Sequence, residues 1–305
     1  MYKGRHLNKI IDLLERDEVA FGRVVMNGSF EELMFWAESN FDFVIIEMEH
    51  EGFNFTNLRQ SLAQLMNRKR ITENGLLADP TPIAWVAPDA REIAVNQWVV
   101  QQTLDQGPYG VIVPGITTPE EAQAAVAAAR YPQRPGSNDT SPEGMRGWWR
   151  RYAPRYWGLT PQEYFDVADL WPLDPDGELI LIGIIEDEAG VKNIRDILKQ
   201  AKGIGAIWME HFDMALSMGV RMGQEDPRVE EGLMKVLTAC KDFGVPCAVG
   251  SADPKEVEMR LNQGFKIIMN GVFKPDMSVL ETGWRVAGRK SSPYPSRKRR
   301  SYRKK

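Results

Sequence analysis

The chain has 305 residues, of which 43% are hydrophobic and 26% charged, and its formal net charge is −4. This composition is typical of a globular protein, and at about 100 to 200 residues per domain the length allows one large domain or two ordinary ones. Two cysteines are too few for a disulfide framework or a multi-cysteine zinc site. No stretch approaches the roughly 20 apolar residues of a membrane span, and the charged start lacks a signal-peptide core. We therefore expect a cytoplasmic protein that does not bind a membrane.

Eight short apolar runs rich in Val and Ile predict strands, and several lack alternation, as strands buried on both faces do. They cover residues 21–27, 42–49, 82–87, 109–116, 179–186, 206–211, 246–251 and 266–272, with helical stretches between them such as 119–130, 188–202, 227–244 and 254–264. This alternation indicates an α/β fold with a parallel sheet, and eight strands close a TIM (β/α)8 barrel. The alternative, an open doubly wound sheet, lacks a G-x-G-x-x-G motif after its first strand.

One irregular stretch, about residues 132–178, separates the fourth and fifth predicted strands. It is rich in Pro, Gly, Arg and Trp and too long for a simple connection, and loops of this length are usually functional or disordered. Its density of Trp and Tyr predicts an ordered lid or a subunit contact. We expect residues 1–287 to form a single barrel domain that includes this insertion.

The end of the chain differs from the rest in charge. Residues 285–305 hold ten Lys and Arg and no acid, which leaves 28 basic against 42 acidic residues in the rest of the chain. Residues 288–305 are also rich in Ser and Pro, which favours a disordered basic tail, either with an anionic partner or as a solvated appendage. Because a nucleic-acid-binding domain is usually basic on one face, we expect no nucleic-acid contact except through this tail.

Carboxylates and histidines follow three of the predicted strands, at the barrel end where active sites lie. They are Glu47, Glu49 and His50 after the second run, Glu186 to Glu188 after the fifth, and Glu210, His211 and Asp213 after the sixth. We expect Asp187 and Glu188 to cap a helix or to be solvated. Glu186 directly ends a very apolar strand, where an unpaired carboxylate is costly. A divalent cation shared with Asp213 of the adjacent strand would remove that cost.

A family resemblance rests on segments distributed over residues 20–285. The segments FDFVIIEMEHEGFNF, YGVIVPGITTPEEAQAAVAAARYP, GMRG, IEDEAGVKNI, FDMALSMG and DPRVEEGLMKVLTACKDFGVP, read in order, resemble the HpcH/HpaI family of metal-dependent (class II) aldolases acting on 2-keto-3-deoxy acids. The resemblance implies a TIM barrel, a divalent metal ion and a homo-oligomer, a dimer or a hexamer built from dimers. It also implies retro-aldol cleavage of a small oxo acid to pyruvate, or an analogue, and an aldehyde.

The resemblance also assigns roles to single residues. It implies that Glu186 and Asp213 bind the metal and that His50 is the catalytic histidine, with Glu47 as its acidic partner where the family usually has Asp. A further catalytic Asp falls on Asp105, within LDQGPYG, and the substrate-binding Arg of the "RG" motif falls on Arg146.

Four positions depart from the family pattern, and all concern the substrate chamber. Trp85 ends the third strand where the family has an Arg that contacts the keto group, and Ile184 stands where it has Gln. Glu210 and His211 replace a Gly-Pro turn that approaches the substrate carboxylate, and Phe273 replaces an Asp. An indole lacks the fork of hydrogen bonds with which Arg binds planar oxyanions. We therefore expect a donor other than plain pyruvate.

Aromatic and histidine residues leave two interpretations open. Trp85, Trp148 and Trp149 would suit a bulkier or aromatic ligand, or they fill the core or an interface. His211 is either a third metal ligand or acid–base group in the substrate chamber, or a histidine packed at the barrel rim. We expect Mg²⁺ or Mn²⁺, and Glu210 beside His211 also admits Co²⁺ or Zn²⁺.

The sequence therefore favours a metal-dependent carbon–carbon lyase that acts on an oxo acid through a metal-bound enolate. A His held by a carboxylate would move the proton. One alternative uses the same chemistry for decarboxylation or hydration of a bulkier or aromatic oxo acid. The other is a catalytically inactive barrel that serves as a binding protein through its basic tail.

Overall fold

The computed structural model describes residues 6–26, 30–75, 77, 79–133, 135, 137, 139–221, 226–251, 253–270 and 277–290. Its strands are β1 (Ala20–Met26), β2 (Phe43–Glu47), β3 (Thr81–Trp85), β4 (Gly110–Val113), β5 (Leu170–Trp171), β6 (Leu179–Ile185), β7 (Ala206–Met209), β8 (Cys247–Ser251) and β9 (Ile267–Asn270). Each of the eight predicted runs overlaps one of these strands, and β1 and β3 begin one residue before the predicted run. The ninth, the two-residue β5, lies in the insertion, where no strand was predicted.

The strands form one closed parallel barrel. Neighbours in the sheet follow the order β4-β3-β2-β1-β9-β8-β7-β6, and β4 also pairs with β6, which closes the ring of eight. The two residues of β5 pair with Leu179 and Ile180, the first two residues of β6. The apolar runs are buried along nearly their whole length because the barrel interior covers one face and the helices cover the other. The predicted TIM barrel is confirmed.

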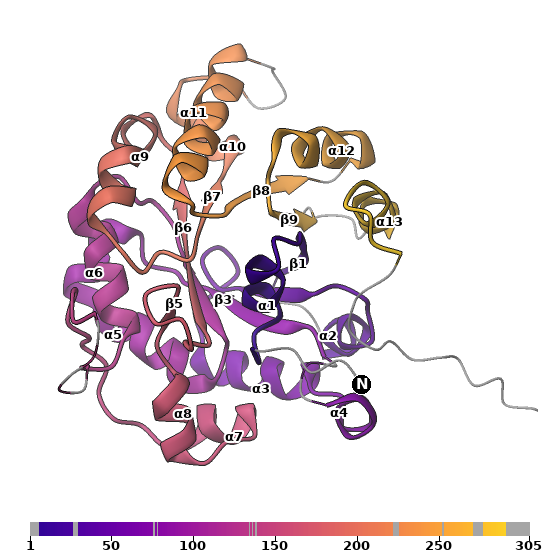
Figure 1. Ribbon diagram of the computed structural model, residues 1–305, viewed down its shortest axis with the longest axis vertical. Helices are drawn as coiled ribbons and strands as arrows, with labels where there is room; N and C mark the ends of the chain where they lie inside the picture. The colour runs from indigo at the N-terminus through magenta and orange to yellow at the C-terminus, as the bar shows by residue number, and fades with distance from the viewer. Residues whose placement is uncertain are drawn as a thin grey trace, which may run out of the picture.

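The helices surround the strands as an outer ring (Figure 1). They are α1 (Lys9–Glu15), α2 (Phe30–Ala37), α3 (Phe55–Leu65), α4 (Arg68–Asn74), α5 (Ala90–Gln106), α6 (Pro119–Ala129), α7 (Tyr152–Trp157), α8 (Pro161–Val167), α9 (Glu188–Gln200), α10 (His211–Ser217), α11 (Pro227–Phe243), α12 (Pro254–Gln263) and α13 (Met277–Val286). Asp226 and Asp253 cap α11 and α12, each followed by a proline at the first helical position. None of the helices in the described ranges has the length and apolar character needed to cross a bilayer.

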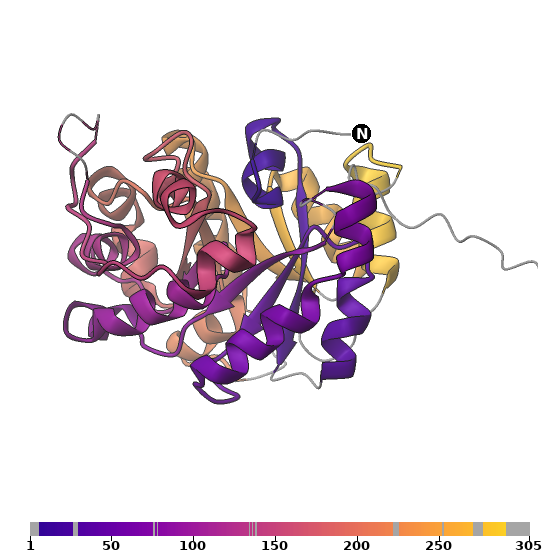
Figure 2. The same cartoon turned by 90° about the horizontal axis from the view of Figure 1, so that it is seen from below.

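Helix α1 closes the amino-terminal end of the barrel, near the N label in Figure 2. The backbone N–H of Lys9 donates to the hydroxyl of Thr81, the first residue of β3, at 3.0 Å. The Asn8 side-chain amide donates to the carbonyls of Tyr109 and Glu178, which directly precede β4 and β6. These contacts fix α1 across the strand beginnings, so access to the barrel interior is from the opposite, carboxyl-terminal end.

The insertion lies at this same amino-terminal end. It leaves α6 at the start of the segment and returns through β5, whose Leu170 pairs with Leu179 at the beginning of β6. The indole N–H of Trp157 in α7 donates to the carbonyl of Gly107, just before β4, at 2.9 Å. The insertion is therefore ordered in its described part, and within one chain it does not cover the carboxyl-terminal mouth as a lid would.

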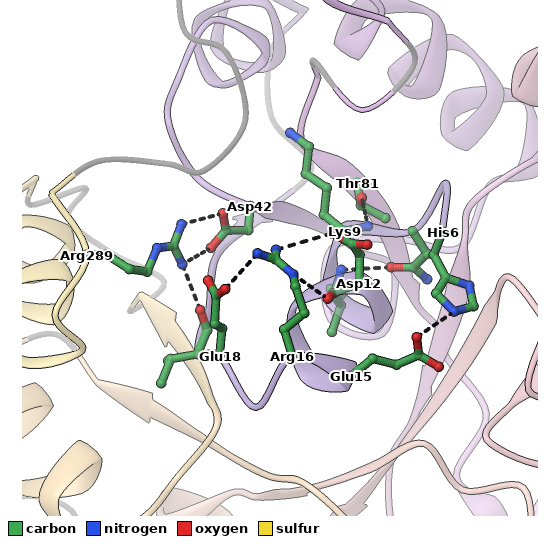
Figure 3. Close-up of polar contacts among 12 residues, drawn as sticks. His6, Lys9, Asp12, Glu15, Arg16, Glu18, Asp42, Thr81 and Arg289 are labelled. Carbon is green, nitrogen blue, oxygen red and sulfur yellow. Dashed lines mark hydrogen bonds and ion pairs between the residues drawn. The ribbon is translucent and has the colours of Figure 1, made fainter. Parts of the chain in front are cut away.

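The described chain ends at residue 290, next to a buried ion pair. Arg289 binds both carboxylate oxygens of Asp42, at 2.9 and 3.0 Å, and donates to the carbonyl of Val19 at 2.7 Å (Figure 3). Asp42 is fully buried. Arg289 thus belongs to the packed body, beyond the expected boundary at residue 287, and the expected disordered segment from 291 onward lies outside the described residues.

Candidate active site

The loop after β2 is held by a buried carboxylate. Glu47, the last residue of β2, accepts hydrogen bonds from the backbone N–H groups of Glu49, His50 (2.6 Å) and Glu51 (3.2 Å). Its carboxylate therefore fixes the backbone that carries His50 and not the imidazole ring itself. The His50 side chain is 61% exposed, with Nε2 at 3.9 Å from the Glu49 carboxylate.

Glu49 also lies in this site, although no role was assigned to it from the sequence. Ligand atoms of Glu47, Glu49 and His50 all lie within 4.8 Å of one another. Burial, together with the charges of Glu47 and Asp213, raises the pKa of Glu49 to about 7 against the opposing effect of His50. The signal was present in the sequence, because Glu49 and His50 are adjacent in the same strand-end motif.

Glu186 follows β6 directly and faces other acids. Burial, and after it the nearby carboxylates of Asp213, Glu49, Asp89 and Glu210, raise its pKa to about 8. Asp213 lies in the first turn of α10, which begins directly after β7, the neighbour of β6. The structure therefore brings Glu186 and Asp213 into one cluster of carboxylates at the carboxyl-terminal mouth.

No cation balances Glu186 or Asp213 within the described ranges. None of the Lys and Arg side chains there lies within 4.0 Å of either carboxylate, and Asp89, the one neighbour with an Arg partner, is paired with Arg91 at 2.8 Å. Carboxylates without a cationic partner are the donor set expected for a hard divalent cation, which takes oxygen ligands. These residues fit a metal ion.

Glu210 and His211 lie at the start of α10. Glu210 is 8% exposed, accepts from the backbone N–H of Phe212 at 3.0 Å, and has a pKa raised to about 7 by burial. Burial lowers the pKa of His211, whose ring stacks beside Phe212 at 4.1 Å. The charges that act on His211 include Glu256 and Arg260 of α12, so it faces the neighbouring helix more than the carboxylate cluster.

Trp85 lies at the mouth, and a second tryptophan, Trp208, lies beside it. Trp85 ends β3 in register with Glu47, and its ring contacts that of Trp208 in β7 at 4.7 Å between centroids. The His50 ring approaches Trp85 edge-on at 5.9 Å. Trp208 was not singled out from the sequence, because a tryptophan within an apolar strand gives no sign of which face it occupies.

Asp105 and Arg146 are brought together, but at the other end of the barrel. They form an ion pair at 3.2 Å, and Arg146 also donates to the hydroxyl of Tyr164 at 3.1 Å and stacks over Tyr131. Burial raises the pKa of Asp105, while Arg146 lowers it. Since α5 runs from the end of β3 to the beginning of β4, Asp105 near its last residue lies at the amino-terminal end. Within one chain the pair does not join the carboxylate cluster.

The remaining predicted residues occupy structural positions. Asp187 caps α9 by accepting from the N–H of Gly190 at 2.7 Å, as expected. Ile184 is fully buried, and Cys240 and Cys247 are buried and free. Trp148 and Trp149 are 53% and 39% exposed on the insertion, away from the mouth. Phe273 lies outside the described residues.

Comparisons with known proteins agree with this geometry. The family model described as HpcH/HpaI aldolase/citrate lyase matches residues 33–274. A 5-keto-4-deoxy-D-glucarate aldolase of Salmonella arizonae is 25% identical over 245 residues, covering 80% of this chain and 81% of the relative. The same enzyme of Salmonella newport is 27% identical over 222 residues, covering 73% of each chain.

The fold has solved counterparts. A crystal structure of an HpcH/HpaI aldolase/citrate lyase family protein from Burkholderia cenocepacia superposes with a TM-score of 0.72 at 24% identity, covering 92% of this chain and 97% of that one. Because the family model spans the barrel from α2 to just beyond β9, including every strand end that carries the carboxylate cluster, the chain belongs to the HpcH/HpaI aldolase/citrate lyase family.

Proposed function

We propose that this protein is a metal-dependent carbon–carbon lyase of the aldolase type that cleaves or forms a bond in an oxo acid other than plain pyruvate. The observation that carries the proposal is Glu186, a half-buried carboxylate at the barrel mouth that faces Asp213, Glu49 and Glu210 and has no cationic partner in the described part of the chain. Such a cluster is unfavourable by itself and becomes favourable around a divalent cation.

Each residue in the cluster has a separate role in this proposal. Glu186 and Asp213 hold the cation, for which Mg²⁺ or Mn²⁺ is proposed and Co²⁺ or Zn²⁺ is possible. When bound, a divalent cation supplies Lewis-acid stabilisation of negative charge on a keto oxygen. Glu47 fixes the loop, and His50, exposed at the mouth beside Glu49, takes or delivers the proton of the substrate hydroxyl.

The site geometry leaves other assigned residues with indirect roles. Glu210 shapes the mouth by capping α10, and His211 packs at the rim behind it. Asp105 in α5 and Arg146 in the insertion form an ion pair, and this pair fixes the insertion to α5. Any contact of theirs with substrate would require a second copy of the chain.

A variant of this proposal uses the same residues for decarboxylation or hydration of a bulkier or aromatic oxo acid. The aromatic surface of Trp85 and Trp208 beside the cluster favours it. The two reactions differ in their products, because only the lyase releases an aldehyde. Product analysis by NMR separates them.

A homo-oligomer, a dimer or a hexamer, is proposed for the assembly. Large apolar side chains are exposed on α2, where Met34 and Phe35 are 54% and 62% exposed, and on α10, where Phe212 and Leu216 are 56% and 54% exposed. Light scattering during size-exclusion chromatography tests this, and a monomer at micromolar concentration would contradict it.

The proposed function is tested by proton NMR of oxo acids in D₂O with the purified protein, with and without Mg²⁺ or Mn²⁺. Exchange of the C3 hydrogens for deuterium needs no knowledge of the aldehyde. We expect metal-dependent exchange that Glu186→Gln and Asp213→Asn abolish and that Glu188→Gln, two residues along in the exposed first turn of α9, retains. Full exchange in the Glu186 and Asp213 variants, with metal bound, would reject the assigned site.

A further inference from the structure

Two buried tryptophans from strands that are not neighbours contact each other beneath the carboxylates. Trp85 belongs to β3 and Trp208 to β7, and β4 and β6 lie between them in the sheet. Their ring contact at 4.7 Å therefore crosses the barrel interior. Trp208 is two residues before Glu210, and its register partner Ile184 is two residues before Glu186, so the two rings lie one layer beneath the carboxylates.

Both indole N–H groups are buried donors without an acceptor. Trp85 is 7% exposed and Trp208 is 2% exposed, and neither Nε1 atom has a hydrogen-bond partner among the described residues. The Trp85 N–H lies close to the Glu49 carboxylate but does not meet the geometry of a hydrogen bond to it. Because a buried N–H without an acceptor is costly, an acceptor atom on a ligand would stabilise this arrangement.

The charges around the two tryptophans are negative. The groups that act on Glu186 are the carboxylates of Asp213, Glu49, Glu210 and Asp89, and of these only Asp89 has an Arg partner in the described ranges. A divalent cation balances two of these charges, and the indoles add donors but no positive charge. A second carboxylate, at the end of a ligand remote from the metal, would therefore meet like charge, and among the described residues no Lys or Arg lies within 4.0 Å of Glu186 or Asp213 to offset it.

We infer that this mouth selects oxo acids with a single carboxylate and an uncharged, planar or apolar remainder, discriminates against dicarboxylic oxo acids, and uses Trp85 and Trp208 as the specificity-determining residues. The inference rests on the proposed function and deepens it. The carboxylate end of the ligand lies toward Glu186 and Asp213. The remainder lies on the two indole rings, with an uncharged oxygen accepting from an indole N–H.

The test compares two five-carbon acids of equal length that differ in one terminal group. Isothermal titration calorimetry of the Mn²⁺-loaded protein measures binding of 2-oxopentanoate, which ends in a methyl group, and 2-oxoglutarate, which ends in a carboxylate. Phenylpyruvate probes the two indole rings. We expect the wild-type protein to bind 2-oxopentanoate and phenylpyruvate at least about tenfold more tightly than 2-oxoglutarate, the size expected for one like-charge contact near a protein surface.

Variants separate the N–H donors from the rings. Trp85→Phe and Trp208→Phe keep an aromatic ring but lose the donor. At least one of them should weaken binding of 4-hydroxyphenylpyruvate, whose phenol oxygen can accept from an indole N–H, about fivefold, as loss of one hydrogen bond does. Phenylpyruvate has no such oxygen, and its affinity should stay unchanged. Trp85→Arg adds a positive charge and should shift the preference toward 2-oxoglutarate by about tenfold or more. Trp148→Phe, on the exposed insertion, is the control and should change none of these affinities.

Two results overturn the inference. One is wild-type binding of 2-oxoglutarate as tight as that of 2-oxopentanoate, and the other is unchanged 4-hydroxyphenylpyruvate affinity in both Phe variants, which remain informative if Trp85→Arg fails to fold. Deuterium exchange distinguishes this failure from failure of the proposed function. Equal exchange of both five-carbon acids rejects the selectivity alone, whereas exchange of neither, with metal bound, rejects the proposed function and the selectivity together.

Discussion

The acidic residues at the two ends of the barrel differ in whether they have cationic partners. At the amino-terminal end, acids have cationic partners: Asp42 binds Arg289, and Asp12 and Glu18 bind Arg16 (Figure 3). At the carboxyl-terminal end, Glu186 and Asp213 face further carboxylates, and no Lys or Arg of the described ranges lies within 4.0 Å of either.

This difference distinguishes acids that stabilise the fold from acids that we propose to bind a ligand. A buried pair contributes to folding when its partners satisfy each other, whereas buried carboxylates facing carboxylates weaken the metal-free protein and require a ligand. The amino-terminal end therefore stabilises the closed barrel, and the carboxyl-terminal end is the proposed ligand-binding end.

The largest expected effect on stability is at the amino-terminal end. Arg289→Ala leaves Asp42 buried without its cation, and breaking a buried pair typically costs about 3 to 5 kcal/mol. Chemical denaturation monitored by circular dichroism measures the loss. Arg285→Ala, four residues earlier and in an exposed pair with Glu258, is the control and should cost less than about 1 kcal/mol. Equal losses for the two variants would contradict the contrast between the ends.

At the carboxyl-terminal end, we expect removal of a charge to stabilise the metal-free protein. The pKa of Glu186 is raised to about 8 in the folded state, so folding is favoured with the carboxyl protonated, and stability is lost as the pH rises from about 4.5 to 8. In the presence of EDTA, Glu186→Gln should therefore be more stable than the wild type at pH 9, by at least about 1.4 kcal/mol, the equivalent of one pKa unit, and equal to it below pH 4.5. The free energy of unfolding of the matched variant Glu188→Gln should not differ from that of the wild type in this pH-dependent way.

A smaller pH effect of the same sign belongs to His6 at the amino-terminal end. Burial alone would lower its pKa, but Glu178 and Glu15, each 3.3 Å from a ring nitrogen, raise it above the ordinary value. The stabilisation is full below pH 6.5 and is lost as the pH rises through the raised pKa. His6→Gln should thus cost more at pH 6 than at pH 9 in thermal unfolding. The exposed His50→Gln is the control, and a pH-independent loss at His6 would refute the pairing.

The smallest effect is expected for the basic tail. A chain truncated after residue 290 keeps Arg289 and should match the full chain in free energy of unfolding and in Mn²⁺ affinity. Truncation after 288 removes Arg289 and should be as unstable as Arg289→Ala. A loss of metal affinity on truncation after 290 would show that the tail contributes to the site.

The fold was predictable from the sequence because unbroken apolar strands alternate with capped helices. The short segment 206–211 illustrates the limit: its strand ends at Met209, and Glu210 and His211 already belong to the cap and first turn of α10. Strand ends depend on the helix that follows, and periodicity in four to six residues cannot fix them.

The candidate site was predictable in part. Glu186 was found because a carboxylate directly after seven buried apolar residues is costly unless it has a ligand or a partner. The hydrogen bonds from the loop backbone to Glu47 depend on turn geometry, and the contact of Trp85 with Trp208 depends on how the barrel closes. Neither is encoded in local spacing. The location of Asp105 and Arg146 at the far end likewise follows from the direction of α5, which residue types do not reveal.

The most direct test of the central claim is calorimetric titration of Mn²⁺ into the metal-free protein at pH 7, in two buffers that differ in ionisation enthalpy. We predict one Mn²⁺ per chain with release of protons, because Glu186 has a pKa of about 8 before the cation binds. Glu186→Gln should lose this binding, and Glu188→Gln should keep it. Binding without proton release and unchanged in Glu186→Gln would show that the carboxylates at the barrel mouth are not the metal site.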